Sequence, residues 1–139
     1  MNFCSRLLVL LSSITVCFGT ELVIKVTGIK DSRGAIGCAL YPSETGFPMN
    51  AEKAKQLWLK AKPDSVECQF EGIPAGKDAD AVSRDLNGNR KTDTNFLGIP
   101  KEDWGVSNNV GPNFRTQRFD EAAFEVLADG IRIEIGIFR

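Results

Sequence analysis

Apolar and polar residues alternate with a period of two along several short stretches of this chain. The clearest run ends the sequence, where isoleucines at 131, 133, 135 and 137 are separated by other residue types. Successive side chains of a strand point to opposite faces of a sheet, so this spacing predicts half-buried strands. The same pattern recurs, and we predict strands near residues 22–27, 36–40, 66–70, 78–85, 122–126 and 131–138.

Turn-forming residues separate these stretches. Glycines bracket residues 28–34, and Asp129-Gly130 predicts a hairpin between the last two strands. Asn50 is a good N-cap, so we expect a short helix from Asn50 to Trp58. The long connection over 92–118 has little periodicity, and loops of that length in a compact domain tend to be functional.

Short strands and frequent turns predict an all-β fold, an antiparallel β-sandwich with one short helix and one long loop. Cys38 and Cys68 fall on the inward faces of two different predicted strands. In an oxidising compartment such a pair favours a disulfide, which would contribute roughly 3–4 kcal/mol. The alternative is a pair of reduced thiols that serve as small buried hydrophobes.

The N-terminus is typical of a secretory signal peptide. Arg6 supplies a positive charge, residues 7–18 are mostly apolar, and Gly19 offers a small residue before a cut. We therefore predict a signal peptide over residues 1–19 and one β-sandwich domain over 20–139.

This signal places the mature protein in the periplasm or outside the cell. Cys17 raises the alternative of a lipoprotein, which Val16 disfavours because it is bulkier than such a cleavage site usually accepts. The apolar run is too short to remain as an anchor, so we expect no membrane span.

Composition excludes several classes of function. Lys and Arg number 17 against 18 Asp and Glu, a net charge of -1, so nucleic-acid binding through phosphates is not expected. The chain has no histidine, which removes Ser/His and Cys/His catalysis and His-ligated zinc. We expect a protein that is not an enzyme. A hydrolase that uses Glu102 and Asp103 is a remote alternative, because adjacent acids on a loop are usually solvated.

The stretch 85–93 carries candidate calcium ligands. Oxygen-bearing side chains stand at alternate positions, as a loop of the EF-hand kind requires. The candidate ligands are Asp85, Asn87, Asn89, the backbone of Lys91, and Asp93.

The calcium pattern is incomplete. Phe96 stands where a bidentate glutamate would complete the shell, so Glu102 or Asp103 would have to fold back to fill that place. The alternative is a metal-free turn, because Asp and Asn cap turns through their own backbone and Asn87-Gly88 is a tight-turn pair.

The long loop offers an aromatic platform and several amides that could hold a sugar or a peptide. The alternative is a packed loop in which Trp104 and Leu97 cover the end of the sandwich. The candidate binding residues are Lys101, Glu102, Trp104, Ser107, Asn108 and Asn109.

Five segments resemble the bacterial secreted family called domain of unknown function 2141. The resemblance implies a small exported β-sandwich of transthyretin-like or immunoglobulin-like type, and it implies no known activity. The matching segments are Gly72–Gly76, Asp85–Asn89, Asp93–Glu102, Gly105–Asn109 and Phe119–Ala122.

The strand before the Asp85 loop departs from the family pattern, which is apolar there and has a histidine before the aspartate. Here Asp78, Asp80 and Arg84 share one face with Val82, and that face would point to the core. Either Asp80 pairs with Arg84, or the strand lies at an edge with that face in water.

Taken together, the sequence predicts an exported bacterial β-sandwich module, a non-enzymatic binding or structural domain of the cell envelope. We expect a monomer with a protein, peptide or glycan ligand. The alternative is a calcium-dependent binding module, with calcium as the only cofactor, held by the Asp85–Asp93 loop.

Overall fold

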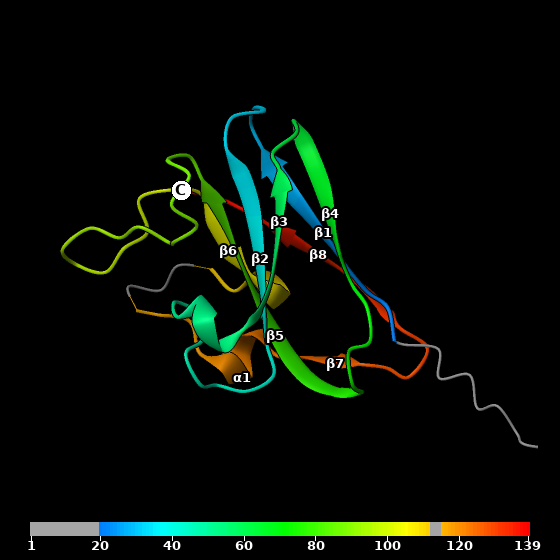
Figure 1. The fold of residues 1–139 in the computed structure, drawn as a ribbon. Coiled ribbons are helices and arrows are strands. Elements are labelled where there is room, and N and C mark those ends of the chain that lie inside the picture. The colour runs from blue at the N-terminus through cyan, green and yellow to red at the C-terminus, as the bar shows by residue number, and fades with distance from the viewer. Residues whose placement is uncertain (1–19, 112–114) are drawn as a thin grey trace, which may run out of the picture.

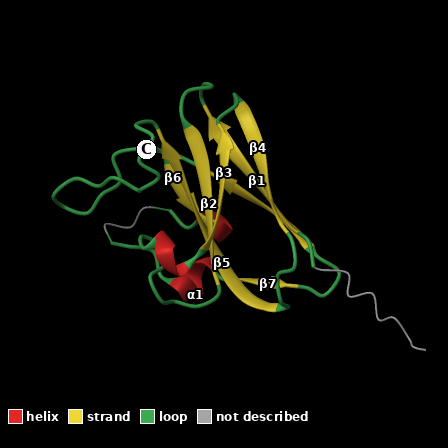
Figure 2. Cartoon of the chain, viewed as in Figure 1, coloured by secondary structure: helices red, strands yellow, loops and turns green. Residues whose placement is uncertain are grey.

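The computed structural model describes residues 20–111 and 115–139, so the predicted signal peptide and Cys17 lie outside the described residues. Its regular structure is almost entirely strand, with short helical turns between strands (Figures 1 and 2). The strands are β1 (Leu22–Ile29), β2 (Ala35–Tyr41), β3 (Lys55–Lys60), β4 (Asp64–Phe70), β5 (Gly76–Asp85), β6 (Trp104–Val106), β7 (Phe124–Val126) and β8 (Ile131–Gly136). The helical turns are η1 (Ala51–Lys53), η2 (Ser107–Asn109) and α1 (Phe119–Ala122).

Two sheets form the two layers of the molecule (Figure 1). The smaller sheet has the order β4-β1-β8, in which β1 runs antiparallel to β4 and parallel to β8. The larger sheet has the order β3-β2-β5-β6, with β7 paired to the start of β5, and all its pairs are antiparallel. The predicted all-β sandwich is confirmed, with one parallel strand pair in the smaller sheet.

The main hydrophobic core lies between the inner faces of the two sheets. Alternate residues of β1, namely Leu22, Ile24 and Val26, are fully buried there. Cys38 of β2 and Cys68 of β4 form a disulfide that joins the larger sheet to the smaller one. The predicted inward direction of both cysteines is therefore confirmed, and the alternative of reduced thiols is wrong.

The predicted hairpin between the last two strands is wrong. A turn does form at Asp129-Gly130, where the Gly130 N–H donates to the carbonyl of Leu127 at 3.0 Å. However, β7 pairs with β5 in the larger sheet, whereas β8 pairs with β1 in the smaller one. Gly130 lies so close to the carbonyl of Glu21 that a Cβ would stand 2.7 Å from it. The glycine thus allows the chain to cross to the edge of β1.

The predicted helix from Asn50 to Trp58 is only partly present. Asn50 caps η1 as expected, because its side chain accepts the N–H of Glu52 at 3.2 Å. The chain then becomes extended, and β3 pairs with β2 along its whole length. Leu57 and Leu59 pack on the core from alternate positions, so a period of two prevails over the helical interpretation.

Strand β5 carries charged side chains into the sandwich. Asp78, Asp80, Val82 and Arg84 are all buried, as expected for one inward face. The strand lies between β2 and β6, so the alternative of an exposed edge strand is wrong.

The expected pair between Asp80 and Arg84 is also wrong. Arg84 instead forms ion pairs with Asp31 and Asp103, and it donates to the backbone carbonyls of Asp31 and Arg33. Both carboxyl oxygens of Asp80 are buried without a hydrogen-bond partner among the described residues. Burial raises the pKa of Asp80 well above its ordinary value, which favours the neutral acid.

Across residues 20–111 and 115–139, no helix is long and apolar enough to cross a membrane.

Candidate functional site

The loop after β5 is organised around the carboxylate of Asp85. One of its oxygens accepts the N–H of Gly88 at 2.9 Å, and the other accepts the N–H of Arg90 at 2.8 Å. The side chain of Asp85 is buried beneath the turn that it holds. This candidate calcium ligand therefore fixes the shape of the loop by itself.

The other candidate ligands in the loop bind one another. The amide nitrogens of Asn87 and Asn89 donate to the carboxylate of Asp93, at 2.7 and 3.0 Å. These hydrogen bonds lower the pKa of Asp93. The amide oxygens accept backbone N–H groups two residues ahead, that of Lys91 among them. Calcium at this place would require both amides to turn their oxygens inward.

The chain beyond Asp93 folds back onto this loop. The N–H of Lys101 donates to the carbonyl of Asp93 at 2.8 Å, and Glu102 accepts the N–H of Leu86 at 2.9 Å. The second carboxylate oxygen of Glu102 is buried and has no hydrogen-bond partner among the described residues. Burial raises the pKa of Glu102, and the charges of Asp85 and Asp93 act in the same direction.

Glu102 therefore stands where the calcium hypothesis needs a further carboxylate. Against this, no three side chains of Asp, Glu or Cys in the described ranges stand close enough to hold a metal ion.

Ser107 cannot contact a ligand, contrary to the interpretation of the long loop as a recognition surface. Its side chain is fully buried. The hydroxyl accepts the N–H of Asp80 at 3.0 Å and donates to the carbonyl of Ala122 at 2.5 Å. It thus connects strand β5 to the α1 turn.

The two asparagines after Ser107 also have structural partners. The amide of Asn108 donates to the carbonyls of Glu121 and Ala123, at 3.0 and 2.9 Å. The amide of Asn109 accepts the N–H of Gly136 at 2.8 Å and donates to a second backbone group of β8. These amides hold the end of the long loop against α1 and β8, although both residues are exposed.

The adjacent acids of the hydrolase alternative have different partners. Asp103 is buried and pairs with Arg84 at 3.6 Å, with Lys30 nearby at 3.8 Å. Glu102 turns toward the loop that begins at Asp85. The alternative in which Leu97 covers the end of the sandwich is also wrong, because its side chain is largely exposed.

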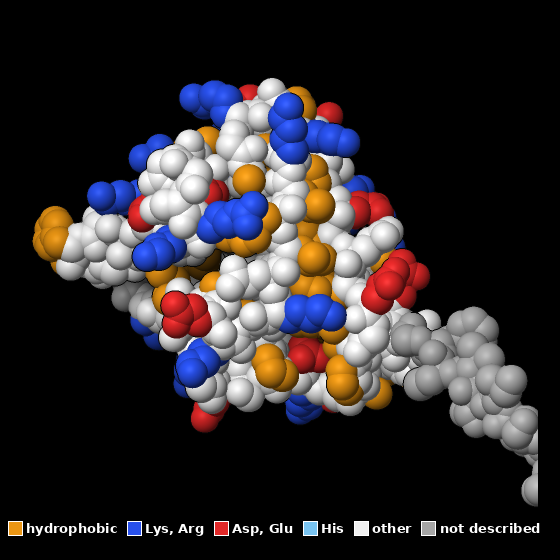
Figure 3. Space-filling view, viewed as in Figure 1, with side chains coloured by type: hydrophobic (Ala, Val, Ile, Leu, Met, Phe, Trp, Pro, Cys, Tyr) orange, Lys and Arg blue, Asp and Glu red, His pale blue; other side chains and the backbone are white. Residues whose placement is uncertain are grey.

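A cleft lies on the outer face of the larger sheet, away from the core. Its floor consists of small residues on two paired strands, where Gly37 and Ala39 of β2 stand opposite Ser83 and Ala81 of β5. No large side chain rises from these four positions, so the sheet surface stays open there. Figure 3 views this side, with hydrophobic side chains gathered in the hollow beside the long loop.

Two tryptophans flank this floor. Trp58 of β3 stands opposite Gly37, and its ring lies over the glycine, where a Cβ would come within 2.6 Å of the indole. Trp104 of β6 stands opposite Ser83, and its ring packs against Phe138 with centroids 5.3 Å apart. Of the predicted binding residues, Trp104 is therefore the one that lines the cleft.

The part of the cleft between the two tryptophans has a volume of only about 40 Å³. Beyond Trp104 it adjoins a larger space of about 390 Å³, which Trp58 and Arg90 do not line. That volume lies within the range of roughly 300–1,000 Å³ that is common for small-molecule sites. Its walls are mainly apolar and include Pro48, Met49, Leu97, Ile99 and Pro100.

The charges that line the cleft are positive. Arg90 places its guanidinium 5.8 Å from the ring centroid of Trp58, and Arg115 stands at the far end, where it pairs with Glu121. Among the described residues that line the cleft, none is Asp or Glu. The cleft therefore combines aromatic walls with guanidinium groups.

Sequence reasoning missed this cleft, although its signals were present. Small residues occupy the outward positions 37 and 39 of one predicted strand and 81 and 83 of another. Strand β3 was not predicted, because residues 50–58 were interpreted as a helix, and Trp58 was therefore not placed in the sheet.

The fold and the cleft define a small two-sheet β-protein with a candidate ligand site on its outer face. Residues 24–134 match the model of a family described as uncharacterised protein conserved in bacteria, DUF2141, and the chain belongs to this family. The resemblance that the motifs indicated is therefore confirmed. No curated protein and no solved structure matches the chain.

Proposed function

We propose that this protein is an exported, non-enzymatic binding domain of the bacterial cell envelope, and that it holds an acidic glycan in the outer cleft. The cleft between Trp58 and Trp104 carries the proposal. Sugar rings present flat C–H faces to aromatic side chains, and the larger space beside Trp104 has a volume that a sugar ring can occupy. The guanidinium of Arg90 matches the carboxylate of a uronic acid, because arginine binds carboxylates through paired N–H groups.

The chemistry of the chain supports binding rather than catalysis. A general acid or base needs a titratable group within reach of a substrate. The carboxyl groups with raised pKa values, Asp78, Asp80 and Glu102, do not line the cleft. Tyr41 does line it, but its buried hydroxyl donates to the carbonyl of Pro48. Export is supported by the signal-like N-terminus and by the Cys38–Cys68 disulfide, since disulfides persist mainly in oxidising compartments.

Tryptophan fluorescence tests the proposal directly, because the chain has two tryptophans and both line the cleft. We expect a saturable change in emission when an oligogalacturonate is added to the mature protein. A neutral cello-oligosaccharide of equal length should give a much weaker change. Arg90→Gln should weaken oligogalacturonate binding about tenfold through the lost charge-assisted bonds. Arg118→Gln is the matched control, because Arg118 is exposed and does not line the cleft.

Three results would contradict this function. Unchanged emission and no binding heat with either sugar would remove the glycan ligand. Equal binding of the neutral and acidic oligomers would remove the role of the carboxylate. Equal affinities of Arg90→Gln and Arg118→Gln would place binding outside the cleft.

Calcium binding at the Asp85–Asp93 loop is a second candidate. The observation that favours it is Glu102, whose buried, unpartnered oxygen lies beside that loop. Because no three carboxylates of the described residues stand close enough to hold the ion without a rearrangement of the loop, we expect weak affinity, in the range of extracellular modules at roughly 10⁻⁴–10⁻³ M.

The calcium hypothesis predicts a melting temperature that rises with calcium, falls with a chelator and responds little to magnesium. Asp93→Ala combined with Glu102→Gln should abolish the rise. Asp85 is left intact in this variant because its carboxylate holds the turn. A calcium response that persists in the double variant would exclude this site.

A further inference from the structure

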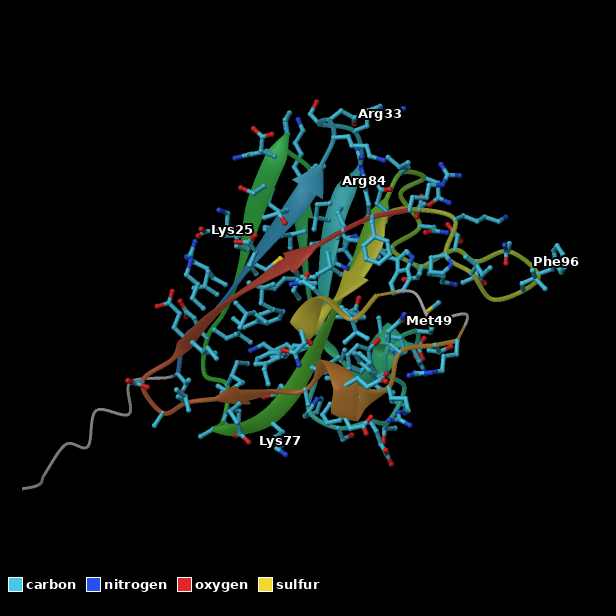
Figure 4. The ribbon with its side chains drawn as sticks, turned by 180° about the vertical axis from the view of Figure 1, so that it is seen from behind. Lys25, Arg33, Met49, Lys77, Arg84 and Phe96 are labelled. Carbon is cyan, nitrogen blue, oxygen red and sulfur yellow. A yellow bond between two sulfur atoms is a disulfide. The ribbon has the colours of Figure 1, made fainter. Side chains whose placement is uncertain are left out.

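A hairpin-shaped segment, residues 93–101, projects from the body of the molecule beside the cleft (Figures 1 and 4). Thr94 and Pro100 form a bridge across it, and Phe96 lies at its far end. Three large apolar side chains stand at or near this tip: the exposed fractions of Phe96, Leu97 and Ile99 are 95%, 68% and 54%. Exposed apolar side chains gathered at a projecting point indicate an interaction surface.

The backbone donors of residues 97–99, next to the tip of this projecting hairpin, are satisfied internally, whereas the N–H of Phe96 has no hydrogen-bond partner among the described residues. The N–H of Gly98 donates to the carbonyl of Asn95 at 3.0 Å. The side-chain oxygen of Asn95 accepts the N–H groups of Leu97 and Ile99, at 2.9 and 3.1 Å. Pro100 has no N–H, so every backbone donor from residue 97 to residue 100 has an internal partner. Internal satisfaction of backbone donors is what an apolar medium requires of a segment that enters it.

The exposed charges behind the tip are positive, although the half-buried carboxylates of Asp93 and Glu102 stand at the same base. Residues 94–100 carry no charged side chain, while Arg90, Lys91 and Lys101 are exposed at the base. The carboxylate of Asp93 at the same base is bound by the amides of Asn87 and Asn89. An uncharged apolar point with cations behind it complements a bilayer whose headgroups are anionic.

We propose that the projecting hairpin inserts Phe96 and Leu97 into the surface of a lipid bilayer that contains anionic headgroups. The cations at its base then contact the phosphates, and the domain lies on the membrane without spanning it. A hydrophobic pocket of a partner protein could also bind the apolar tip. The hydrogen bonds that Asn95 accepts within the hairpin and the cations at its base favour a lipid surface instead. This inference rests on the outward tip and the glycan proposal on the tryptophan walls, although Arg90 and Leu97 line the cleft as well.

Vesicle flotation tests the insertion. We expect the mature protein to float with vesicles of phosphatidylglycerol and phosphatidylcholine in equal parts, and only weakly with pure phosphatidylcholine. Phe96→Ser combined with Leu97→Ser should reduce partitioning by at least about tenfold, because two apolar side chains lose their burial. Leu127→Ser is the control, since Leu127 is also exposed but lies on another part of the surface. Thermal unfolding of each variant checks that its fold is intact.

Phe96→Trp gives a second, direct readout, because it places an indole at the tip. On the mixed vesicles the emission of this variant should shift to the blue relative to that of the wild-type protein, and brominated acyl chains should quench the added emission. If the wild-type protein does not float with the vesicles, the proposal is wrong, and a hydrophobic pocket of a partner protein becomes the better candidate for binding the tip. Full binding by the double serine variant would also overturn it, as would emission from the tip indole that brominated lipid does not quench.

Discussion

The hydroxyl of Ser107 accepts the backbone N–H of Asp80 at 3.0 Å, in the fully buried interior where β5 passes beneath η2. The same hydroxyl donates to the carbonyl of Ala122. A single side chain thus satisfies one backbone donor and one backbone acceptor from segments far apart in the sequence. Ser107 therefore connects the long loop to both the larger sheet and α1.

Replacing Ser107 with alanine should destabilise the fold. The substitution leaves the buried N–H of Asp80 and the carbonyl of Ala122 without this partner, and such a loss costs about 1–3 kcal/mol. Urea unfolding monitored by circular dichroism measures the change. Ser32→Ala is the control, because Ser32 is exposed and its loss should alter stability by less than about 0.5 kcal/mol. Equal midpoints for the two variants would contradict the buried role of Ser107.

Asp80 should make the stability of the protein depend on pH above the ordinary pKa of an aspartic acid. Burial raises the pKa of Asp80 in the folded protein well above its value in the unfolded chain, so folding takes up a proton between the two values. The stabilisation is complete below the unfolded pKa and is lost as the pH rises through the folded pKa.

We therefore expect wild-type stability, measured relative to Asp80→Asn, to increase as the pH falls from above the raised pKa of Asp80 toward the ordinary Asp pKa of about 3.9, by up to roughly 1.4 kcal/mol per pH unit. The asparagine has nearly the same shape and does not titrate there. Glu121 and Asp31, whose pKa values are lowered by arginine partners, act in the opposite direction at more acidic pH and cancel in the comparison. Parallel pH profiles for the two proteins would contradict a neutral buried Asp80.

The disulfide should contribute a large part of the stability. Cys38 and Cys68 are 30 residues apart, and closing a loop of that length stabilises by roughly 3–4 kcal/mol. Cys38→Ala combined with Cys68→Ala should lower the free energy of unfolding by about that amount. Reductant should weaken the wild-type protein toward the variant and leave the variant unchanged. An equal effect of reductant on both proteins would show that the stabilisation lies elsewhere.

The sequence was sufficient to predict the strands whose two faces differ strongly. In β1 and β8, isoleucine and valine alternate with other residues, and burial follows the same alternation in β1. The cysteine pair was predictable for the same reason, because Cys38 and Cys68 each fall in phase with buried neighbours. Local side-chain period is a property of the sequence alone, so it needs no knowledge of the partner strand.

The sequence did not predict which segments far apart in the chain would pair or contact each other. The turn at Asp129-Gly130 specifies a local reversal, but the free edges of β1 and β5 decide where the flanking strands pair. The structural contacts of Asn108 and Asn109 could not be predicted, because their backbone partners lie on other elements. The cleft was missed for the same reason: Trp58 becomes a wall only when β3 lies beside Gly37.

Arg84 and Arg33 offer a final comparison, because both form ion pairs with Asp31 in different surroundings. The side chain of Arg84 is 3% exposed and also pairs with Asp103, whereas that of Arg33 is 76% exposed. Arg84→Met should destabilise by about 3 kcal/mol, because it leaves the buried carboxylate of Asp103 with only the exposed ammonium of Lys30, 3.8 Å away. Arg33→Met should change stability by no more than about 1 kcal/mol, since water screens the exposed pair.

The double variant Arg84→Met with Asp103→Asn separates two causes of the stability lost in Arg84→Met: the uncompensated charge of Asp103, and the lost hydrogen bonds to backbone carbonyls. If the cost of Arg84→Met comes from the uncompensated charge, the asparagine should restore a substantial part of the stability in urea unfolding. If the two changes simply add, Arg84 stabilises mainly through the carbonyls of Asp31 and Arg33, to which it also donates. Equal effects of Arg84→Met and Arg33→Met would contradict both explanations, because burial would then make no difference to the pair with Asp31.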